Sequence, residues 1–435
     1  MNKLIILFSS QIITILINFF ISVAVARYLG ADLRGEYAFI MLFVNLIPTI
    51  ANFGSLSALP YVLRNDGFHY KDVESKTIKI SLLFSFLSSC IVSIIYILRA
   101  QDTVGNFDEN YVFIILWLCF FFSLKIWFQK IFVSLGLFKN FGWISVFGSV
   151  MVLFSVLTVI YFDWSLIGLL TAQVIINFLL FLIYLTRSWK VANFEKPKSK
   201  ITTNGYYKAI FDFSKKSFVG DLANRVSLRL DQIFISVLLA ANDLGIYVIA
   251  VVLCELLFTF MNSIGMVLFR EIANEKSMHA KRSITERSSR IIFSFSILVA
   301  LIFGSLCYYL IPILYGEEFN FSKFVLLAYL PGVVFYNICS IISKFNGASG
   351  LVIYNTYTQV LTLIIGLPVI FWLTKNYQII GAAIGSTLMF SFSSLIAMFF
   401  YFHLKKEISN IFFCNKTDMV FVTSSIKQYF KFKLN

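Results

Sequence analysis

The sequence predicts an all-α integral membrane protein with about twelve transmembrane helices, arranged as two six-helix lobes that form a parallel internal repeat around a central cavity. Three observations support this fold class: the composition, a series of long apolar runs, and short motifs that recur at nearly one offset. Of the 435 residues, 59% are hydrophobic and only 13% are charged. Soluble domains have about 25% charged residues. The chain therefore lacks the polar surface of a soluble enzyme, a repeat scaffold or a disordered protein.

Twelve apolar runs are long enough to cross a membrane, since a hydrocarbon core of about 30 Å needs about 20 apolar residues per helix. The first six runs cover residues 4–26, 36–60, 78–98, 111–133, 142–162 and 164–186. The other six cover residues 214–239, 244–268, 289–311, 322–343, 356–374 and 379–402. The runs are too long, and alternate too little, for the strands of a membrane β-barrel. Pro48, Pro331 and Pro368 lie within these runs and are expected to kink their helices.

The distribution of basic residues predicts the orientation. With the N-terminus placed in the cytoplasm, 27 of the 36 lysines and arginines fall on the cytoplasmic side, 5 fall outside and 4 fall within spans. This bias follows the positive-inside rule and predicts that both termini are cytoplasmic. The net charge of +14 is thereby explained without nucleic-acid binding.

Three short motifs recur in the same order along the two halves of the chain. LGADLRGEY at Leu29–Tyr37 resembles LAANDLGIY at Leu239–Tyr247, SLGL at 134–137 resembles ASGL at 348–351, and IGLL at 167–170 resembles IGAA at 380–383. An even number of spans in each half makes the repeat parallel, which is a transporter plan. The expected organisation is an N-lobe at 1–186, a basic cytoplasmic linker at 187–213, a C-lobe at 214–402 and a basic cytoplasmic tail at 403–435.

The sequence offers no recognisable catalytic or cofactor site. It has no GxxxxGK[ST] loop and no HExxH motif, and its six cysteines show neither metal-ligand nor CxxC spacing. The outer loops are expected to be short, the longest lying near residues 99–110, which disfavours a membrane-embedded polymerase. We therefore expect a non-enzymatic protein without ATP hydrolysis, metal or cofactor, while coupling to H⁺ or Na⁺ stays open.

Charged residues within the spans are the candidate functional residues, because each costs at least about 2.5–3.5 kcal/mol at mid-bilayer unless it is paired or hydrated. Asp221, Arg225 and Arg229 are spaced to share one face of the seventh span, and Glu255 and Lys125 lie at similar depths. One interpretation is a cationic cavity in which Arg225, Arg229 and Lys125 bind a pyrophosphate. The alternative is a structural role, with Arg225 paired to Glu255 or Arg229 paired to Asp221.

Uncharged polar residues also recur within the spans. They include the candidate cavity-lining side chains Gln11, Asn18, Asn52, Asn177, Asn262 and Asn337. Any one of them could simply form an interhelical hydrogen bond in the membrane. As a set, they indicate a hydrated cavity that could hold sugar hydroxyls.

Four stretches of the chain carry a family resemblance: ARYLGADLRGEYAF at Ala26–Phe39, LDQIFISVLLAANDLGIYVIAV at Leu230–Val251, IPILYGEEF at Ile311–Phe319 and IIGAAIGSTL at Ile379–Leu388. With these stretches the chain resembles the polysaccharide flippase branch of the multidrug/oligosaccharidyl-lipid/polysaccharide (MOP) flippase superfamily. The resemblance implies a MATE-like fold and a Wzx-type O-antigen flippase of the bacterial inner membrane. Such a flippase would move an undecaprenyl-pyrophosphate-linked repeat unit between leaflets within membrane lipid, and a polysaccharide polymerase and a chain-length regulator are the partner proteins it implies.

Two other transport functions are considered. A MATE-type drug antiporter would need intramembrane carboxylates for a cationic cargo. The interiors of the N-terminal spans contain none, while three lie in the seventh and eighth spans. A flippase for lipid II, or for a capsule or teichuronic unit, would bind its cargo through the same kinds of interaction, and only the sugar would differ. Arg27 lies at the outer end of the first span and not within it, which weakens the lipid II alternative.

Overall fold

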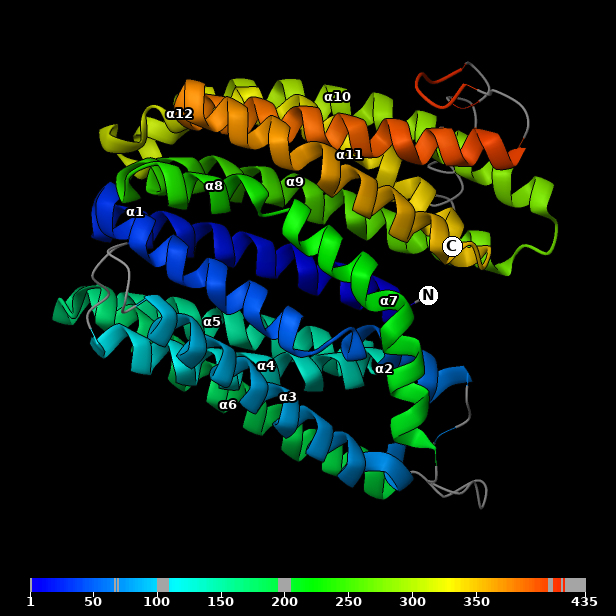
Figure 1. Ribbon diagram of the computed structural model, residues 1–435, viewed down its shortest axis with the longest axis horizontal. Coiled ribbons are helices and arrows are strands. Elements are labelled where there is room, and N and C mark those ends of the chain that lie inside the picture. The colour runs from blue at the N-terminus through cyan, green and yellow to red at the C-terminus, as the bar shows by residue number, and fades with distance from the viewer. Residues whose placement is uncertain are drawn as a thin grey trace, which may run out of the picture. The chain divides into compact units, whose positions relative to one another are not determined.

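The computed structural model describes residues 2–65, 68, 70–99, 109–194, 205–405, 410–415 and 418. Within these ranges the chain is helical, without strands (Figure 1). The first helices are α1 (Asn2–Ala51), α2 (Ser55–Asn65), α3 (Tyr70–Arg99), α4 (Glu109–Ser134), α5 (Phe138–Phe162) and α6 (Ser165–Phe194). They are followed by α7 (Tyr206–Ser227), α8 (Leu230–Leu238), α9 (Ala241–Asn274), α10 (Met278–Tyr315), the 3₁₀-helix η1 (Glu317–Phe319), α11 (Ser322–Ala348) and α12 (Val352–Lys405). The predicted outer loop near 99–110 and much of the predicted linker and tail lie outside the described residues.

Nine of the described helices are long and apolar enough to cross a membrane. Two of them contain two predicted spans each: α1 bends at Gly30, and α12 bends at Gln378, where φ is 54°. The chain is therefore a multi-pass membrane protein, and its helices are compatible with twelve spans. The seventh predicted span was wrong as one continuous helix, because the chain leaves the helical conformation at Arg229 (φ −131°, ψ 5°) between α7 and α8.

The chain divides into two compact units, residues 1–248 and 249–435. In the first unit, α4 packs against both α3 and α6, while α5 packs against α1. Its core includes large buried rings such as Trp127, Phe128 and Tyr184. In the second unit, α11 packs against α10 and α12 around a core that includes Phe345 and Tyr401. The predicted lobe boundary at 186–214 stays a prediction.

The repeated SLGL and ASGL motifs adopt the same backbone conformation in the two halves. Gly136 and Gly350 have φ of 69° and 77°, a left-handed region that glycine enters without strain. In each case the next residue closes the preceding helix: the Leu137 amide donates to the Phe132 carbonyl, and the Leu351 amide donates to the Asn346 carbonyl, at 2.9 and 2.8 Å. The same helix ending therefore occurs at both copies of the motif.

The turns before the third pair of repeated motifs also match. Ser165 and Gln378 both have φ of 54°, although neither is a glycine. A Cβ atom added to Gly168 would meet Trp164, and one added to Gly381 would meet Tyr377, which occupies the equivalent position. Local strain and local packing thus recur at the offset that the sequence motifs define, which supports the predicted internal repeat.

The first pair of repeated motifs forms a close helix crossing inside the first unit. A Cβ atom on Gly35 of α1 would lie 1.8 Å from the Ala241 carbonyl oxygen, and one on Gly245 of α9 would lie 2.0 Å from the Ala31 carbonyl oxygen. The two contacts are reciprocal, because Ala31 and Gly35 correspond to Ala241 and Gly245 in the repeat. Reciprocal contacts of this kind are the mark of a two-fold relation between the contacting segments.

The described residues that follow α12, 410–415 and 418, are hydrogen-bonded to α10 in the second unit. Arg290 donates to both carboxylate oxygens of Asp418 at 2.6 and 2.9 Å, and Ser289 donates to the Ile411 carbonyl at 2.9 Å. The Asp418 side chain is 1% exposed. The hydrogen bonds from Arg290 are the main cause that lowers the pKa of this carboxyl below its ordinary value of 3.8.

We expect Asp418→Asn to lower the thermal unfolding midpoint at neutral pH, by the equivalent of about 1–3 kcal/mol, because the charge-assisted hydrogen bonds are lost. A lowered pKa stabilises the fold above pH 3.8, and this contribution disappears as the pH falls through the lowered value. The difference between wild type and variant should therefore shrink below about pH 4 in unfolding scans of the purified protein. Asp212→Asn, at an exposed carboxylate of α7, is the matched control. A difference that is equally large at pH 3 would contradict this linkage.

Candidate functional site

Lys125 and Gln129 lie on one face of α4. They are four residues apart, so their side chains lie one above the other on the helix. The other face of the same turns carries buried residues of the core, including Leu124, Trp127 and Phe128. The apolar face fixes the rotation of α4, and that rotation turns Lys125 and Gln129 toward a cavity between the helices.

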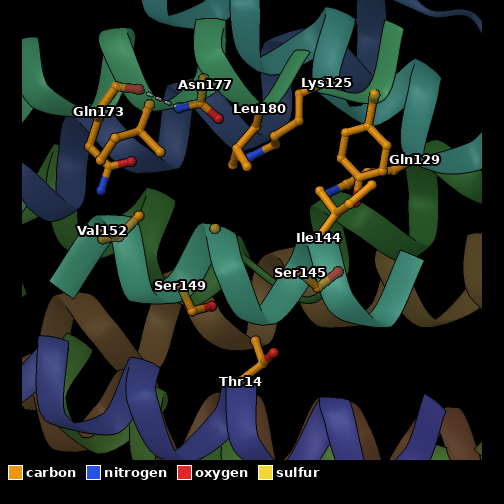
Figure 2. A pocket seen from close by; sticks show the side chains of 13 residues that line it. Thr14, Lys125, Gln129, Ile144, Ser145, Ser149, Val152, Gln173, Asn177 and Leu180 are labelled. Atoms are coloured by element: carbon orange, nitrogen blue, oxygen red, sulfur yellow. Dashed lines mark hydrogen bonds between the residues drawn. The ribbon is translucent and has the colours of Figure 1, made fainter. Parts of the chain in front are cut away.

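The cavity has a volume of about 220 Å³ and lies within the first unit. Figure 2 shows that α4 and α6 contribute side chains from one side and α5 from the other, with α1 adding Thr14. The lining consists of Thr14, Lys125, Gln129, Ile144, Ser145, Gly148, Ser149, Val152, Gln173, Ile176, Asn177, Leu180 and Tyr184. Polar side chains from four helices thus meet in one cavity of the first unit.

Lys125 is the cation of this cavity. Among the described residues that line the cavity, there is one lysine and no carboxylate. Its ammonium nitrogen lies 4.4 Å from the centre of the Phe122 ring. Such a contact contributes about 0.5–2 kcal/mol, which is less than the roughly 2.5–3.5 kcal/mol that a lysine costs at the centre of a membrane. An anion in the cavity would offset the remainder.

Neutral hydrogen-bonding groups surround the lysine. Asn177 donates to the Gln173 carbonyl at 2.7 Å, which fixes its amide at the cavity wall (Figure 2). The Thr14 hydroxyl has no hydrogen-bond partner among the described residues. Because a buried polar group without a partner is unfavourable, this hydroxyl favours a polar occupant such as a sugar or water.

Arg225 lies in a separate charged cluster, and not with Lys125. Asp221 accepts a hydrogen bond from Ser57 and interacts electrostatically with Arg225 and Lys130. Arg225 is exposed, whereas Asp221 and Lys130 are half-buried. The structure therefore divides the predicted cationic set: Lys125 faces the cavity, while Arg225 lies beside a carboxylate.

The break between α7 and α8 changes the position of Arg229. Since the helix is interrupted at this residue, Asp221, Arg225 and Arg229 do not form one continuous helical stripe, and this part of the sequence interpretation was wrong. Arg229 is half-buried and has an interaction partner. Glu255 is half-buried on α9, belongs to the second unit and also has a partner.

The predicted cavity-lining amides occupy different environments. Asn177 lines the cavity, Gln11 is half-buried with a partner, and Asn18 is exposed on α1. Asn52 is 1% exposed, and it accepts a hydrogen bond from the Trp127 indole, as an interhelical structural amide would. Asn337 is buried in α11 of the second unit. The side chain of Asn262 lies outside the described residues.

Six polar lining residues were not among the predicted site residues: Thr14, Gln129, Ser145, Ser149, Gln173 and Tyr184. The spacing held a usable signal, because Gln129 follows Lys125 by four residues, and Ser149 follows Ser145 by four. Such pairs share a helix face. Tyr184 carried no comparable signal. In the part of the chain that the structure describes, no group of three or more His, Cys, Asp or Glu side chains could hold a metal ion.

The chain matches a known protein family. Residues 1–269 match the family model described as "Polysaccharide biosynthesis protein", which is more than half of the chain. None of the curated protein sequences compared with the chain matches it.

Several solved structures have the same fold over nearly the full length of the chain. The lipid II flippase MurJ in an inward closed conformation is 16% identical with a TM-score of 0.71, covering 98% of each chain. An inward-facing multidrug resistance MATE family transporter of the MOP superfamily is 12% identical with a TM-score of 0.72, covering 93% of this chain and 100% of its own. A MOP superfamily transporter from Pyrococcus furiosus, whose binding pocket is described as having reverse polarity, is 11% identical with a TM-score of 0.69, covering 93% and 95%. At these identities the similarity establishes the MATE-like fold.

Proposed function

Because the chain belongs to the polysaccharide biosynthesis protein family, we propose that it flips an undecaprenyl-pyrophosphate-linked oligosaccharide, of the O-antigen repeat-unit type, from the cytoplasmic to the periplasmic leaflet. The observation that carries the proposal is the cavity of Lys125, which combines one cation with hydroxyls and amides and has no carboxylate among its described lining residues. A pyrophosphate needs a cation, and a sugar needs neutral hydrogen-bonding groups. Transport proceeds by alternating access without ATP hydrolysis.

Lys125 would contact the pyrophosphate or an acidic sugar, while Gln173, Asn177 and the Thr14 hydroxyl would bind sugar hydroxyls. Drug-sized ligand pockets have volumes of about 300–1,000 Å³. The cavity of about 220 Å³ is therefore a subsite for one part of the head group. Arg225 and Arg229 stay proposed contacts for the pyrophosphate, with Asp221 and Glu255 as proposed charge partners.

The polarity of the cavity favours a lipid-linked sugar over a cationic drug. A cationic cargo would meet Lys125 without a compensating carboxylate among the described lining residues, and like charges repel strongly where the dielectric constant is low. A MATE-type drug antiporter is therefore the second candidate function. A flippase for lipid II, or for a capsule or teichuronic unit, differs only in the sugar that the neutral side chains bind.

The proposed site of action is the bacterial inner membrane, with both termini in the cytoplasm and with a polysaccharide polymerase and chain-length regulator as proposed partners. The bias of 27 cytoplasmic to 5 outer basic residues supports this orientation. Reporter fusions at Lys281 and Lys323 should therefore report opposite sides of the membrane. The same side for both would contradict the orientation.

A reconstituted flipping assay tests the function. The protein is incorporated into liposomes with a panel of fluorescent polyprenyl-pyrophosphate sugars, and the fraction that reaches the opposite leaflet is measured by a membrane-impermeant quencher. We expect flipping of at least one neutral or acidic oligosaccharide without added ATP, and no exchange of cationic dyes. Exchange of cationic dyes in place of the lipid-linked sugars would overturn the proposal in favour of a drug antiporter.

A further inference from the structure

A groove of about 590 Å³ runs between α10 and α11 in the second unit. It is lined mainly by apolar and aromatic side chains: Phe293, Ile297, Ala300, Leu301, Gly304, Ser305, Tyr308, Tyr309, Leu327, Leu330, Pro331, Val334 and Phe335. Ser305 donates its hydroxyl hydrogen to the Leu301 carbonyl of its own helix, so it adds no free donor to the wall. The groove therefore suits a hydrocarbon chain.

The groove is long enough for an acyl chain of one leaflet of a membrane. Its α10 wall extends from Phe293 to Tyr309, about 24 Å at 1.5 Å per residue, and its α11 wall from Leu327 to Phe335, about 12 Å. Half of a hydrocarbon core of about 30 Å is about 15 Å. Leu301 and Tyr309 are 66% and 70% exposed. The groove is therefore open to the outside along α10.

The two ends of the groove differ in chemistry. At one end, Phe293 packs against Phe335 and meets Phe412 edge to face, so aromatic rings close the groove there. At the other end, the Lys323 ammonium nitrogen lies 4.5 Å from the centre of the Tyr308 ring and 5.2 Å from that of Phe324. Tyrosines and lysines of this kind are typical of the level of the lipid head groups.

Lys323 lies at the mouth of the groove, beside the rings of Tyr308 and Phe324. Its ammonium packs on the two rings, and no described residue forms a salt bridge with it. A cation beside an apolar slot that is long enough for an acyl chain is complementary to a lipid whose head group carries net negative charge.

We propose that this groove binds a phospholipid with an anionic head group, with one acyl chain between α10 and α11 and the phosphate at Lys323. A zwitterionic lipid offers the same acyl chain and phosphate, but its own ammonium group opposes Lys323. The site therefore selects phosphatidylglycerol over phosphatidylcholine. The proposal is independent of the cargo, because the groove and the cavity of Lys125 lie in different units.

Native mass spectrometry of the full-length protein tests the site. The protein is equilibrated with micelles that contain equal amounts of phosphatidylglycerol and phosphatidylcholine, and the lipids retained per protein are counted. We expect wild type to retain phosphatidylglycerol about fivefold over phosphatidylcholine, the effect of one lysine at an anionic lipid surface. Lys323→Gln should bring the ratio close to one, while Lys375→Gln, at an exposed lysine of α12, should leave it unchanged.

A second pair of variants tests the acyl slot. Gly304→Leu should fill the groove, where an added Cβ already approaches a Leu330 methyl group at 2.9 Å, and should remove one retained lipid of either kind. Ser305→Phe fills the same groove from an exposed position and serves if the glycine variant does not fold. An unchanged lipid count in a folded groove variant would overturn the proposal. So would a phosphatidylglycerol preference that survives Lys323→Gln, or one that falls equally in Lys375→Gln.

Discussion

Replacing Lys125 with methionine should reduce flipping of the lipid-linked sugar by about ten- to a hundredfold at low substrate concentration, because one charge-assisted contact contributes about 1.5–3 kcal/mol. The same change should leave the thermal unfolding midpoint unchanged or raise it. Methionine has a similar length, and it removes a cation for which the cavity provides no carboxylate among its described lining residues. Lys125→Arg retains the charge and should keep part of the transport.

The combination of the two measurements separates binding from structure. A lysine that stabilises the fold would lower both stability and transport when it is removed, whereas a lysine that binds the cargo lowers transport alone. Lys139→Met, at an exposed lysine of α5, is the matched control and should change neither. Full transport by Lys125→Met would remove this residue from the proposed site and leave Arg225 and Arg229 as candidates.

Much of the fold could be predicted from the sequence because membranes leave few choices. A spanning segment must satisfy its own backbone hydrogen bonds, so each long apolar run has to be helical. The repeated motifs were equally informative where they need a particular backbone. Gly136 and Gly350 follow the ends of helices and adopt the left-handed conformation. A short motif predicts structure only where its residues are needed for a particular backbone conformation, as these glycines are. This explains why the matched offsets in sequence correspond to matched turns in the structure.

The break between α7 and α8 could not be predicted in the same way. Residues 214–239 contain neither proline nor a glycine near Leu228, so no residue marks the interruption. The division of the charged residues was hidden for a related reason. Lys125 and Lys130 lie on the same helix, but only the rotation of α4 determines that the first faces the cavity while the second faces Asp221. Helical rotation depends on packing against neighbours, which apolar composition alone does not encode.

The reciprocal crossing of α1 and α9 leads to the second large expected effect. Gly35→Ala should destabilise the protein by about 3 kcal/mol or more, because its Cβ would lie 1.8 Å from a backbone oxygen and the two helices would have to separate. Gly245→Ala should behave alike, with 2.0 Å to the Ala31 carbonyl oxygen. We expect both variants to show low membrane abundance and a lowered unfolding midpoint in detergent, although alanine is the better helix former.

Gly265→Ala is the matched control for this crossing. Gly265 also lies buried within α9, but an added Cβ there would meet only the flexible Lys344 side chain at 3.4 Å, so the substitution should be tolerated. The two crossing variants should also fail to be additive, since either one alone forces the same pair of backbones apart. A double variant no less stable than each single variant would therefore support one shared contact. Independent, additive losses would show that Gly35 and Gly245 act at separate contacts, and an unchanged Gly35→Ala protein would contradict the crossing itself.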